Sequence, residues 1–267
     1  MSNTITNHQA DITRALSLHT YAPISLSQMT NVALLNRTDT KYVLPAATLQ
    51  QIVPTLADAY SVLAVDGQRA SNYRTLYFDS AEFTLYHRHH AGILDRYKVR
   101  SREYVDSHLA FLEVKHKTNQ GRTIKRRVQT PELAASFYGE AVDLLDDAYP
   151  YDAAALAPKL WVEYRRITLV SRHREERVTI DLDLSYRWDD QIVSLPHLAI
   201  VEIKQEGFSH NSDIGRALRQ QQVRSTGFSK YCIGTSLIYP DLKHNNFKPK
   251  LRLVEKLARE QSHVTLH

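Results

Sequence analysis

Charged and apolar residues alternate in five short segments of the chain, which is typical of β-strands that carry charge on one face only. In residues 96–102 a basic side chain occupies every second position, and Tyr97 and Val99 lie between them. The five alternating segments are residues 37–41, 96–102, 113–117, 177–181 and 202–204. The pattern therefore predicts strands with one charged face and one largely apolar face.

Two architectures fit such strands. An antiparallel sheet with one solvated face would leave the charges in water. An inside-out barrel would instead line its lumen with the charges and turn the apolar faces outward, under helices. Five segments with the same mixture of many cations and few carboxylates favour the barrel. A lumen crowded with like charge is destabilising unless an anion is bound, so the barrel predicts a ligand with several negative charges.

Helix start signals supply the covering elements. A proline at the first helical position or a capping serine or threonine marks each start. The predicted helices begin at Pro45 (through Leu56, with a kink at Pro54), Ser80 (through Tyr86), Thr130 (through Phe137), Ser212 (through Val223) and Pro249 (through Leu257). Strands combined with short covering helices predict an α+β fold.

Composition and charge limit the possible partners and the cellular compartment of the protein. The chain of 267 residues contains 34 Lys and Arg against 29 Asp and Glu, so its net charge of +5 suits an anionic partner. One cysteine excludes an internal disulfide, and no apolar run approaches the roughly 18 residues of a membrane span. We therefore expect a cytoplasmic protein with a single domain over residues 1–267 and no membrane span. Disorder is expected over residues 1–23, and a C-terminal helix over 247–267.

Several familiar motifs are absent from the sequence. Neither a G-x-x-x-x-G-K-[ST] loop nor a G-x-G-x-x-G turn occurs, so side chains rather than a glycine loop must hold any phosphate. No G-x-S-x-G nucleophile signature is present. The run His87–His90 lacks accompanying metal-site motifs, and packing or surface histidines are the favoured interpretation. Cys232 is interpreted as a buried small residue.

Four carboxylates lie among the cations of the alternating segments: Asp39, Glu113, Asp181 and Glu202. They either balance charge within the lumen or bind Mg²⁺ or Mn²⁺, which combine a few carboxylates with substrate phosphates. Glu202 is the first choice for a metal ligand, because it lies in the apolar run 198–203 that predicts a well-ordered strand.

These segments occur in an order that resembles a known family. The matching motifs are R-x-D-x-K-Y (37–42), Y-F-D (77–79), K-V-R-x-R-x-Y (98–104), F-L-E-V-K-x-K (111–117), Lys125, Y-x-R (164–166), R-V-T-I-D (177–181), V-E-I-K (201–204) and F-S-K-Y (228–231). Each motif alone is weak, but together they resemble the VTC (vacuolar transporter chaperone) polyphosphate polymerase domain, within the CYTH or triphosphate tunnel metalloenzyme superfamily.

The resemblance implies a closed tunnel of eight antiparallel strands, with basic residues facing the lumen and short helices outside. It implies that Arg100, Lys230 and Glu202 are catalytic and that Glu202 binds Mn²⁺ or Mg²⁺. Residues implied to contact ATP triphosphate or polyphosphate are Lys41, Lys98, Arg100, Arg102, Lys115, Lys125, Arg166, Arg177, Lys204, Ser229 and Lys230.

One departure from the superfamily bears on the reaction. Its tunnel hydrolases carry E-x-E-x-K on the first strand, whereas this chain has Arg37, Asp39 and Lys41 there. Loss of the first acid argues against two metals that activate water, and favours transfer of the ATP γ-phosphoryl group to polyphosphate. A tri- or polyphosphatase and a non-catalytic polyphosphate or nucleotide sensor stay open as alternatives.

The expected partners follow from the same resemblance. They are ATP and inorganic polyphosphate rather than nucleic acid, because most of the tyrosines fall at strand ends or on apolar faces instead of interleaving with the basic residues. The SPX domain and membrane helices of eukaryotic relatives are not recognisable here. A membrane-bound or regulatory partner protein of unknown identity stays open.

Overall fold

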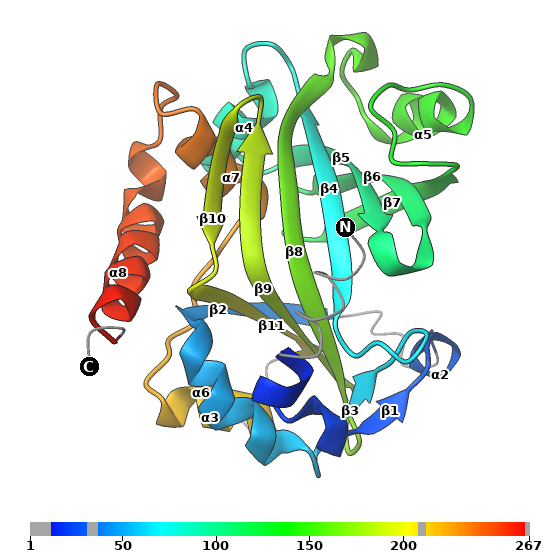
Figure 1. Ribbon diagram of the computed structural model, residues 1–267. Coiled ribbons are helices and arrows are strands. Elements are labelled where there is room, and N and C mark those ends of the chain that lie inside the picture. The colour runs from blue at the N-terminus through cyan, green and yellow to red at the C-terminus, as the bar shows by residue number, and fades with distance from the viewer. Residues whose placement is uncertain (1–11, 31–36, 208–211, 265–267) are drawn as a thin grey trace.

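A curved antiparallel sheet dominates the computed structural model, which describes residues 12–30, 37–207 and 212–264 (Figure 1). Eight strands follow one another across it in the order β2-β11-β9-β8-β4-β5-β6-β7. Three shorter strands complete an 11-stranded sheet: β10 pairs with β9, β3 pairs with β8, and β1 pairs in parallel with β3. The strands are β1 Ala22–Ile24, β2 Arg37–Pro45, β3 Tyr60–Leu63, β4 Ser71–Asp79, β5 Arg96–Tyr104, β6 Leu109–Lys117, β7 Thr123–Thr130, β8 Ala157–Ser171, β9 Glu176–Trp188, β10 Gln191–Leu195 and β11 Leu198–Glu206.

The predicted closure of the tunnel is not found. Within the described residues, the end strands β2 and β7 do not pair with each other. A loop occupies part of the free edge of β2 instead: Tyr42 forms an isolated bridge with Ser225, and the Thr226 N–H donates to the Lys41 carbonyl at 2.8 Å. The α+β class and the antiparallel path of eight strands agree with expectation, but the sheet forms an open trough.

Helices α3, α5 and α6 cover the outer, convex face of the sheet, as the alternating pattern predicts. Val178 and Ile180 of β9 pack against α3 and α6, while Val99 of β5 and Val114 of β6 pack near α5. The helices are α2 Leu26–Thr30, α3 Leu49–Ile52, α4 Thr84–His90, α5 Glu140–Ala148, α6 Asp213–Gln220, α7 Lys230–Ile238 and α8 Lys248–Val264, with 3₁₀ turns η1 Leu18–Thr20, η2 Ala46–Thr48, η3 Val53–Leu56, η4 Val105–Ser107, η5 Ala153–Ala155 and η6 Asn245–Phe247.

Four of the five predicted helices are present near their start signals. Residues 46–56 are helical after Pro45, and Pro54 falls in the 3₁₀ turn η3. Ser212 caps α6 by accepting from the Gly215 N–H at 3.1 Å. At the start of α4 the carboxylate of Asp79 shares the capping with Ser80, since it accepts from the backbone N–H groups of residues 80, 85 and 86. The last helix, α8, begins at residue 248 rather than 247.

The helix predicted after Thr130 is wrong. Thr130 is the last residue of β7 and pairs with Ala110, and the next helix, α5, begins only at Glu140. The Ala134 N–H donates to the Ser101 hydroxyl at 2.9 Å instead of to a helical carbonyl. Strand pairing and this side-chain acceptor therefore override the local Thr-Pro signal.

The structure also differs from the expected disorder before Ile24. Leu18 is fully buried and Tyr21 is 2% exposed, and both belong to the core cluster under α3. The Tyr21 hydroxyl donates to the Val53 carbonyl. Residues 12–23 are therefore packed on the sheet, while residues 1–11 lie outside the described part of the chain.

Helix α7, which the sequence did not reveal, fills one end of the concave face. It is buried almost all round, so it shows no polar stripe. Its Tyr231 and Ile233 pack with Val162 of β8 and Ile200 of β11. Its first residue, Lys230, points into the trough, where its ammonium group contacts Asp181. The helix N-terminus therefore adds positive potential to the concave face.

Close packing of α7 on the sheet gives a first prediction. A Cβ at Gly234 would lie 2.8 Å from Leu160 Cδ2 and still closer to the Tyr186 ring. Gly234→Ala should therefore lower the free energy of unfolding by about 1–3 kcal/mol through overpacking. Gly227→Ala is the control, because a Cβ there meets only Lys250 Cε at 4.0 Å. Equal stability of the two variants in urea unfolding would contradict this packing.

Candidate functional site

The concave face gathers charged side chains because each strand turns its alternate residues toward it. Arg100 on β5 pairs with Glu113 on β6, and Arg166 on β8 pairs with Asp181 on β9. Glu202 on β11 lies opposite Lys41 on β2. Antiparallel register sets such pairs side by side, so residues far apart in sequence form one charged surface.

Glu113 is the centre of the first charge cluster. Its side chain is fully buried, and its Oε2 accepts from Arg100 Nε at 2.7 Å and lies 2.6 Å from Nη2. Lys125 contacts the other carboxylate oxygen. Burial would raise the pKa of Glu113, but Arg100, Arg102 and Lys125 together lower it well below its usual range. The carboxylate is therefore ionised and holds two cations in the trough.

Asp181 organises the second cluster. Its two oxygens accept from Arg166 Nε at 2.6 Å and Nη2 at 2.8 Å, and Lys230 contacts Oδ2. The Lys230 ammonium also lies 4.5 Å from the centroid of the Tyr164 ring. Burial favours the neutral acid, but the two cations outweigh it and lower the pKa of Asp181. Bidentate contact fixes the guanidinium of Arg166 in one orientation.

Glu202, the predicted metal ligand, is also paired with two cations. Its Oε1 lies 3.2 Å from Lys41 Nζ, and Lys204 contacts Oε2. Within the described residues no group of three or more His, Cys, Asp or Glu side chains comes together as a metal site. Glu202 therefore fits a divalent cation only as a single carboxylate, with phosphate oxygens and water as the other ligands. Binding would require it to release at least one lysine.

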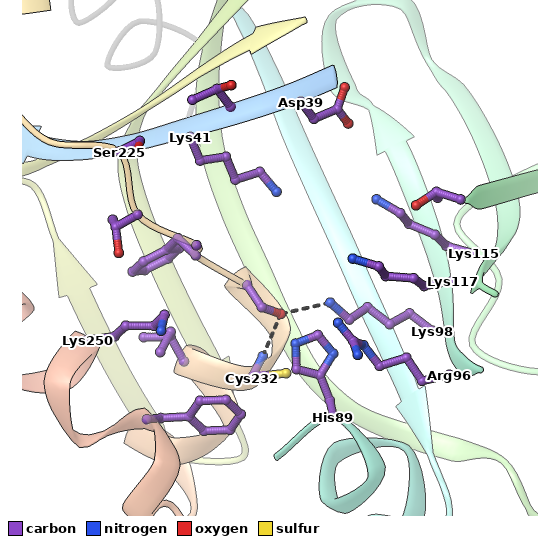
Figure 2. Close-up of a pocket in the computed structure, with 18 residues that line it drawn as sticks. Asp39, Lys41, His89, Arg96, Lys98, Lys115, Lys117, Ser225, Cys232 and Lys250 are labelled. Atoms are coloured by element: carbon purple, nitrogen blue, oxygen red, sulfur yellow. Dashed lines mark hydrogen bonds between the residues drawn. The ribbon is translucent and has the colours of Figure 1, made fainter. Parts of the chain in front are cut away.

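A first cavity, of about 630 Å³, opens where β2 faces the starts of β5 and the ends of β6. Figure 2 shows Lys41 on one side and Lys98, Lys115 and Lys117 on the other, all pointing into the space between them. We call it the lysine cavity; its lining includes Asp39, Lys41, His89, Arg96, Lys98, Lys115, Lys117, Ser229, Cys232, Phe228, Phe247 and Lys250.

The lysine cavity contains more positive charge than its carboxylates balance. Among the described residues neither Lys98 nor Lys115 forms an ion pair; Lys98 Nζ donates to the Ser229 hydroxyl at 2.9 Å. Burial, followed by the neighbouring cations Lys98 and Lys41, lowers the pKa of Lys115 to about 7. The predicted contact residue Ser229 also caps α7 by accepting from the Cys232 N–H at 3.2 Å.

A second cavity, of about 720 Å³, lies at the opposite ends of β5 and β6. We call it the aromatic cavity, because rings stand beside its cations. Burial lowers the pKa of its Lys204 to about 8, although Glu202 opposes the shift. Its lining includes Ser71, Tyr73, Tyr104, Asp106, Phe111, Lys125, Arg127, Arg166, Thr168, Arg177, Thr179 and Lys204.

All eleven predicted ligand-contact residues thus lie on the concave face or at its two cavities. Arg102, between the cavities on β5, has its guanidinium carbon 5.6 Å from the Tyr73 ring centroid and 5.9 Å from that of Tyr164. Three further basic residues that line the cavities were not predicted from the sequence: Arg96, Lys117 and Arg127. The first two lie in the alternating segments 96–102 and 113–117. Sequence interpretation also missed His89, whose buried Nδ1 lacks a hydrogen-bond partner in the described part of the chain.

His89 and His90, from the run of histidines, lie in different surroundings. His89 lines the lysine cavity, where burial and then Lys98 lower the pKa of His89 to about 2, so its ring is neutral. His90 instead packs against the turn η6, and its Nε2 accepts from the Asn246 N–H at 3.2 Å. No described helix combines the length and the apolar character that a membrane span requires.

Solved structures with similar backbones share little sequence with this chain. A putative adenylate cyclase from Bacillus halodurans is 14% identical, with a TM-score of 0.48, and the match covers 73% of this chain and 94% of that one. A putative adenylyl cyclase from Hippeastrum, described as having a dominant triphosphatase activity, is also 14% identical, with a TM-score of 0.45 and coverage of 74% and 94%. A conserved hypothetical protein from Pyrococcus furiosus is 11% identical, with a TM-score of 0.39 and coverage of 71% and 92%.

Sequence comparison gives the family. No curated protein matches the chain. The family model described as the VTC domain matches residues 36–239, which include ten of the eleven strands and every residue predicted for the site. The match extends over more than half of the 267 residues. The chain therefore belongs to the VTC domain family.

Proposed function

We propose that this protein transfers the γ-phosphoryl group of ATP to a growing inorganic polyphosphate chain. The VTC domain suggests a function in phosphoryl transfer from triphosphates or in their hydrolysis. The observation that supports a linear polyanion best is the uneven charge of the concave face. Three carboxylates each hold two cations there, and Lys98, Arg102 and Lys115 form no ion pair among the described residues.

Unsatisfied hydroxyl groups on the same face support a phosphate ligand. The Tyr164 hydroxyl and Thr179 Oγ1 are buried and have no hydrogen-bond partner within the described residues. A buried hydroxyl without a partner is costly, and phosphate oxygens are strong acceptors for it. The N-terminus of α7, next to Lys230, favours an anion in the same place.

The proposed mechanism relies on positioning and on charge neutralisation. Arg100 and Arg166, held by Glu113 and Asp181, would orient the triphosphate and stabilise the charge on the transferring group. Lys230 would contact the leaving or attacking oxygen. The attacking terminal phosphate is already an anion, so no general base is needed. A divalent cation on Glu202 would supply further neutralisation of the phosphate oxygens.

Primer dependence tests this proposal. Purified protein is incubated with ATP and Mn²⁺ or Mg²⁺, with and without inorganic tripolyphosphate, and chain length is followed on gels. A polymerase should show a lag in polyphosphate formation that the added tripolyphosphate shortens. Inhibition of orthophosphate release by tripolyphosphate, without any chain growth, would instead indicate a hydrolase.

The lowered lysine pKa values predict pH-dependent binding. Lys115, with a pKa of about 7, and Lys204, with a pKa of about 8, lose protons as the pH rises through this range in the free protein. A bound polyanion favours their charged forms, so binding takes up protons and the affinity for tripolyphosphate should fall between pH 6.5 and 9. Calorimetric titrations at several pH values measure it; an affinity that rises with pH would contradict the assignment.

The same pKa values predict the direction in which the stability of the free protein changes with pH. Both lysines have lower pKa values folded than unfolded, so the unfolded chain binds more protons between about pH 7 and 10. Their contribution therefore stabilises the fold as the pH rises through that window. Ligand binding and folding should respond to pH in opposite directions, which separates loss of affinity from loss of structure.

A further inference from the structure

The two cavities differ in how they present aromatic rings. In the lysine cavity, Phe228 is 6% and Phe247 8% exposed, and both belong to a hydrophobic core cluster. In the aromatic cavity, Tyr104 and Phe111 are only partly buried and line the open space. Their ring centroids lie 5.8 Å apart, nearly perpendicular. The aromatic cavity therefore offers accessible ring faces, which the lysine cavity does not.

A planar group, the guanidinium of Arg127, already lies over the ring of Phe111. The guanidinium carbon of Arg127 lies 4.5 Å from its centroid, and Arg127 is itself exposed at the free edge strand β7. A planar heteroaromatic ring stacks on such a surface in the same way, and the guanidinium adds a second stacking partner. The ring of Tyr73 packs beside this surface, with its centroid 4.9 Å from that of Tyr104. On its other side it stacks on Tyr164.

Strand register connects these rings to the proposed triphosphate site. Phe111 lies directly opposite Arg102, and Arg102 and Arg100 follow Tyr104 inward along the same face of β5. At about 3.3 Å per residue, the two arginines lie about 7 and 13 Å further along the strand from Tyr104. A molecule with a flat ring at the mouth and a phosphate chain that extends inward matches this order of side chains.

We propose that the aromatic cavity binds the nucleoside of the nucleotide substrate, with its base on Tyr104 and Phe111, and that the acceptor chain comes from the lysine cavity. This assignment rests on the proposed function. In the transfer step, a terminal oxygen of the acceptor forms a bond to the γ-phosphorus while the bond to the β–γ bridging oxygen breaks. The electron pair leaves with the nucleoside diphosphate, on the side of the aromatic cavity.

Ligand pairs with and without a base test the subsite. Dissociation constants for ATP and for inorganic tripolyphosphate are measured on the intact protein by calorimetry, and on Phe111→Leu and Tyr104→Leu. Both variants keep apolar bulk, so folding should be retained. Loss of a stacking ring should weaken ATP about tenfold and leave tripolyphosphate unchanged. Tyr138→Leu is the control, because Tyr138 is 59% exposed and lines neither cavity.

The outcomes separate this inference from the proposed function. Equal weakening of ATP and tripolyphosphate, or no weakening of either, would overturn the nucleoside subsite. Selective weakening of ATP binding supports the subsite even where the native protein forms no polyphosphate. In that case only the proposed polymerase activity is refuted. Chain growth whose KM for ATP is unaffected by Phe111→Leu and Tyr104→Leu would leave the polymerase intact and refute the subsite.

Discussion

Arg100→Ala should weaken the binding of ATP and tripolyphosphate about 10- to 100-fold. A charge-assisted hydrogen bond contributes about 1.5–3 kcal/mol, and each 1.4 kcal/mol changes a dissociation constant tenfold. Arg100 is held on Glu113 by two nitrogens, and its Nη1 donates to the Tyr77 hydroxyl at 3.1 Å. Its orientation is therefore fixed before the ligand arrives, so little entropy is lost on binding. Calorimetric titration with each ligand measures the loss.

The same substitution should also destabilise the fold. It leaves the fully buried carboxylate of Glu113 with Lys125 as its remaining ion-pair partner, and breaking a buried pair costs up to about 3–5 kcal/mol. Arg100→Met combined with Glu113→Gln removes both partners and should recover part of the stability without recovering affinity. Arg74→Ala is the control, since Arg74 pairs with Glu103 on the opposite face of β5. Full binding by the double variant would show that Arg100 does not contact the ligand.

Glu202→Gln should abolish metal-dependent turnover while the protein stays folded. The amide is nearly isosteric with the carboxylate, but it binds a divalent cation far less well. It also removes the negative charge that Lys41 and Lys204 now share, so both ammonium groups become free for phosphate. Metal-free tripolyphosphate should therefore bind at least as tightly as in the native protein. Initial rates with ATP and Mn²⁺ or Mg²⁺, together with metal-free titrations, measure both effects.

A matched control isolates the metal effect from general loss of charge. Glu103→Gln makes the same change on the opposite face of β5, where Glu103 pairs with Arg74, and should retain native turnover. Native rates in Glu202→Gln would refute the assignment of Glu202 as the metal ligand. Weaker metal-free binding of tripolyphosphate by this variant would show that Glu202 positions Lys41 and Lys204 rather than limiting their charge.

The charged face was predictable because it depends only on the alternation of side chains within each strand. Every second residue of 96–102 shares a face whatever the partner strand is, so the cations of β5 could be grouped from sequence alone. The ion pairs could not, because the pairing of Arg166 with Asp181 depends on register between strands. The alternating pattern placed Asp181 on a charged face and the family resemblance implied a ligand contact for Arg166, and the register of β8 with β9 brings the two together.

The elements that the sequence did not reveal have physical explanations. Helix α7 is buried on nearly all sides, because α4 and the concave face enclose it, so no amphipathic stripe marks it in the sequence. The sheet stays open at β2 because the loop at Ser225 and Thr226 occupies part of the free edge of that strand. Its hydrogen bonds join residues far apart in the sequence, so a local pattern does not predict them. Closure implied by family resemblance therefore did not carry over to the arrangement of this chain.

Product analysis of ATP turnover tests the central proposal most directly. The protein is incubated with ATP labelled at the γ-phosphate and with Mn²⁺ or Mg²⁺, and ADP, orthophosphate and long-chain polyphosphate are resolved over time. We predict that ADP and labelled polyphosphate accumulate together, with little label in orthophosphate. Label that appears in orthophosphate without chain growth, or an absence of turnover despite tight tripolyphosphate binding, would contradict polyphosphate synthesis by this protein.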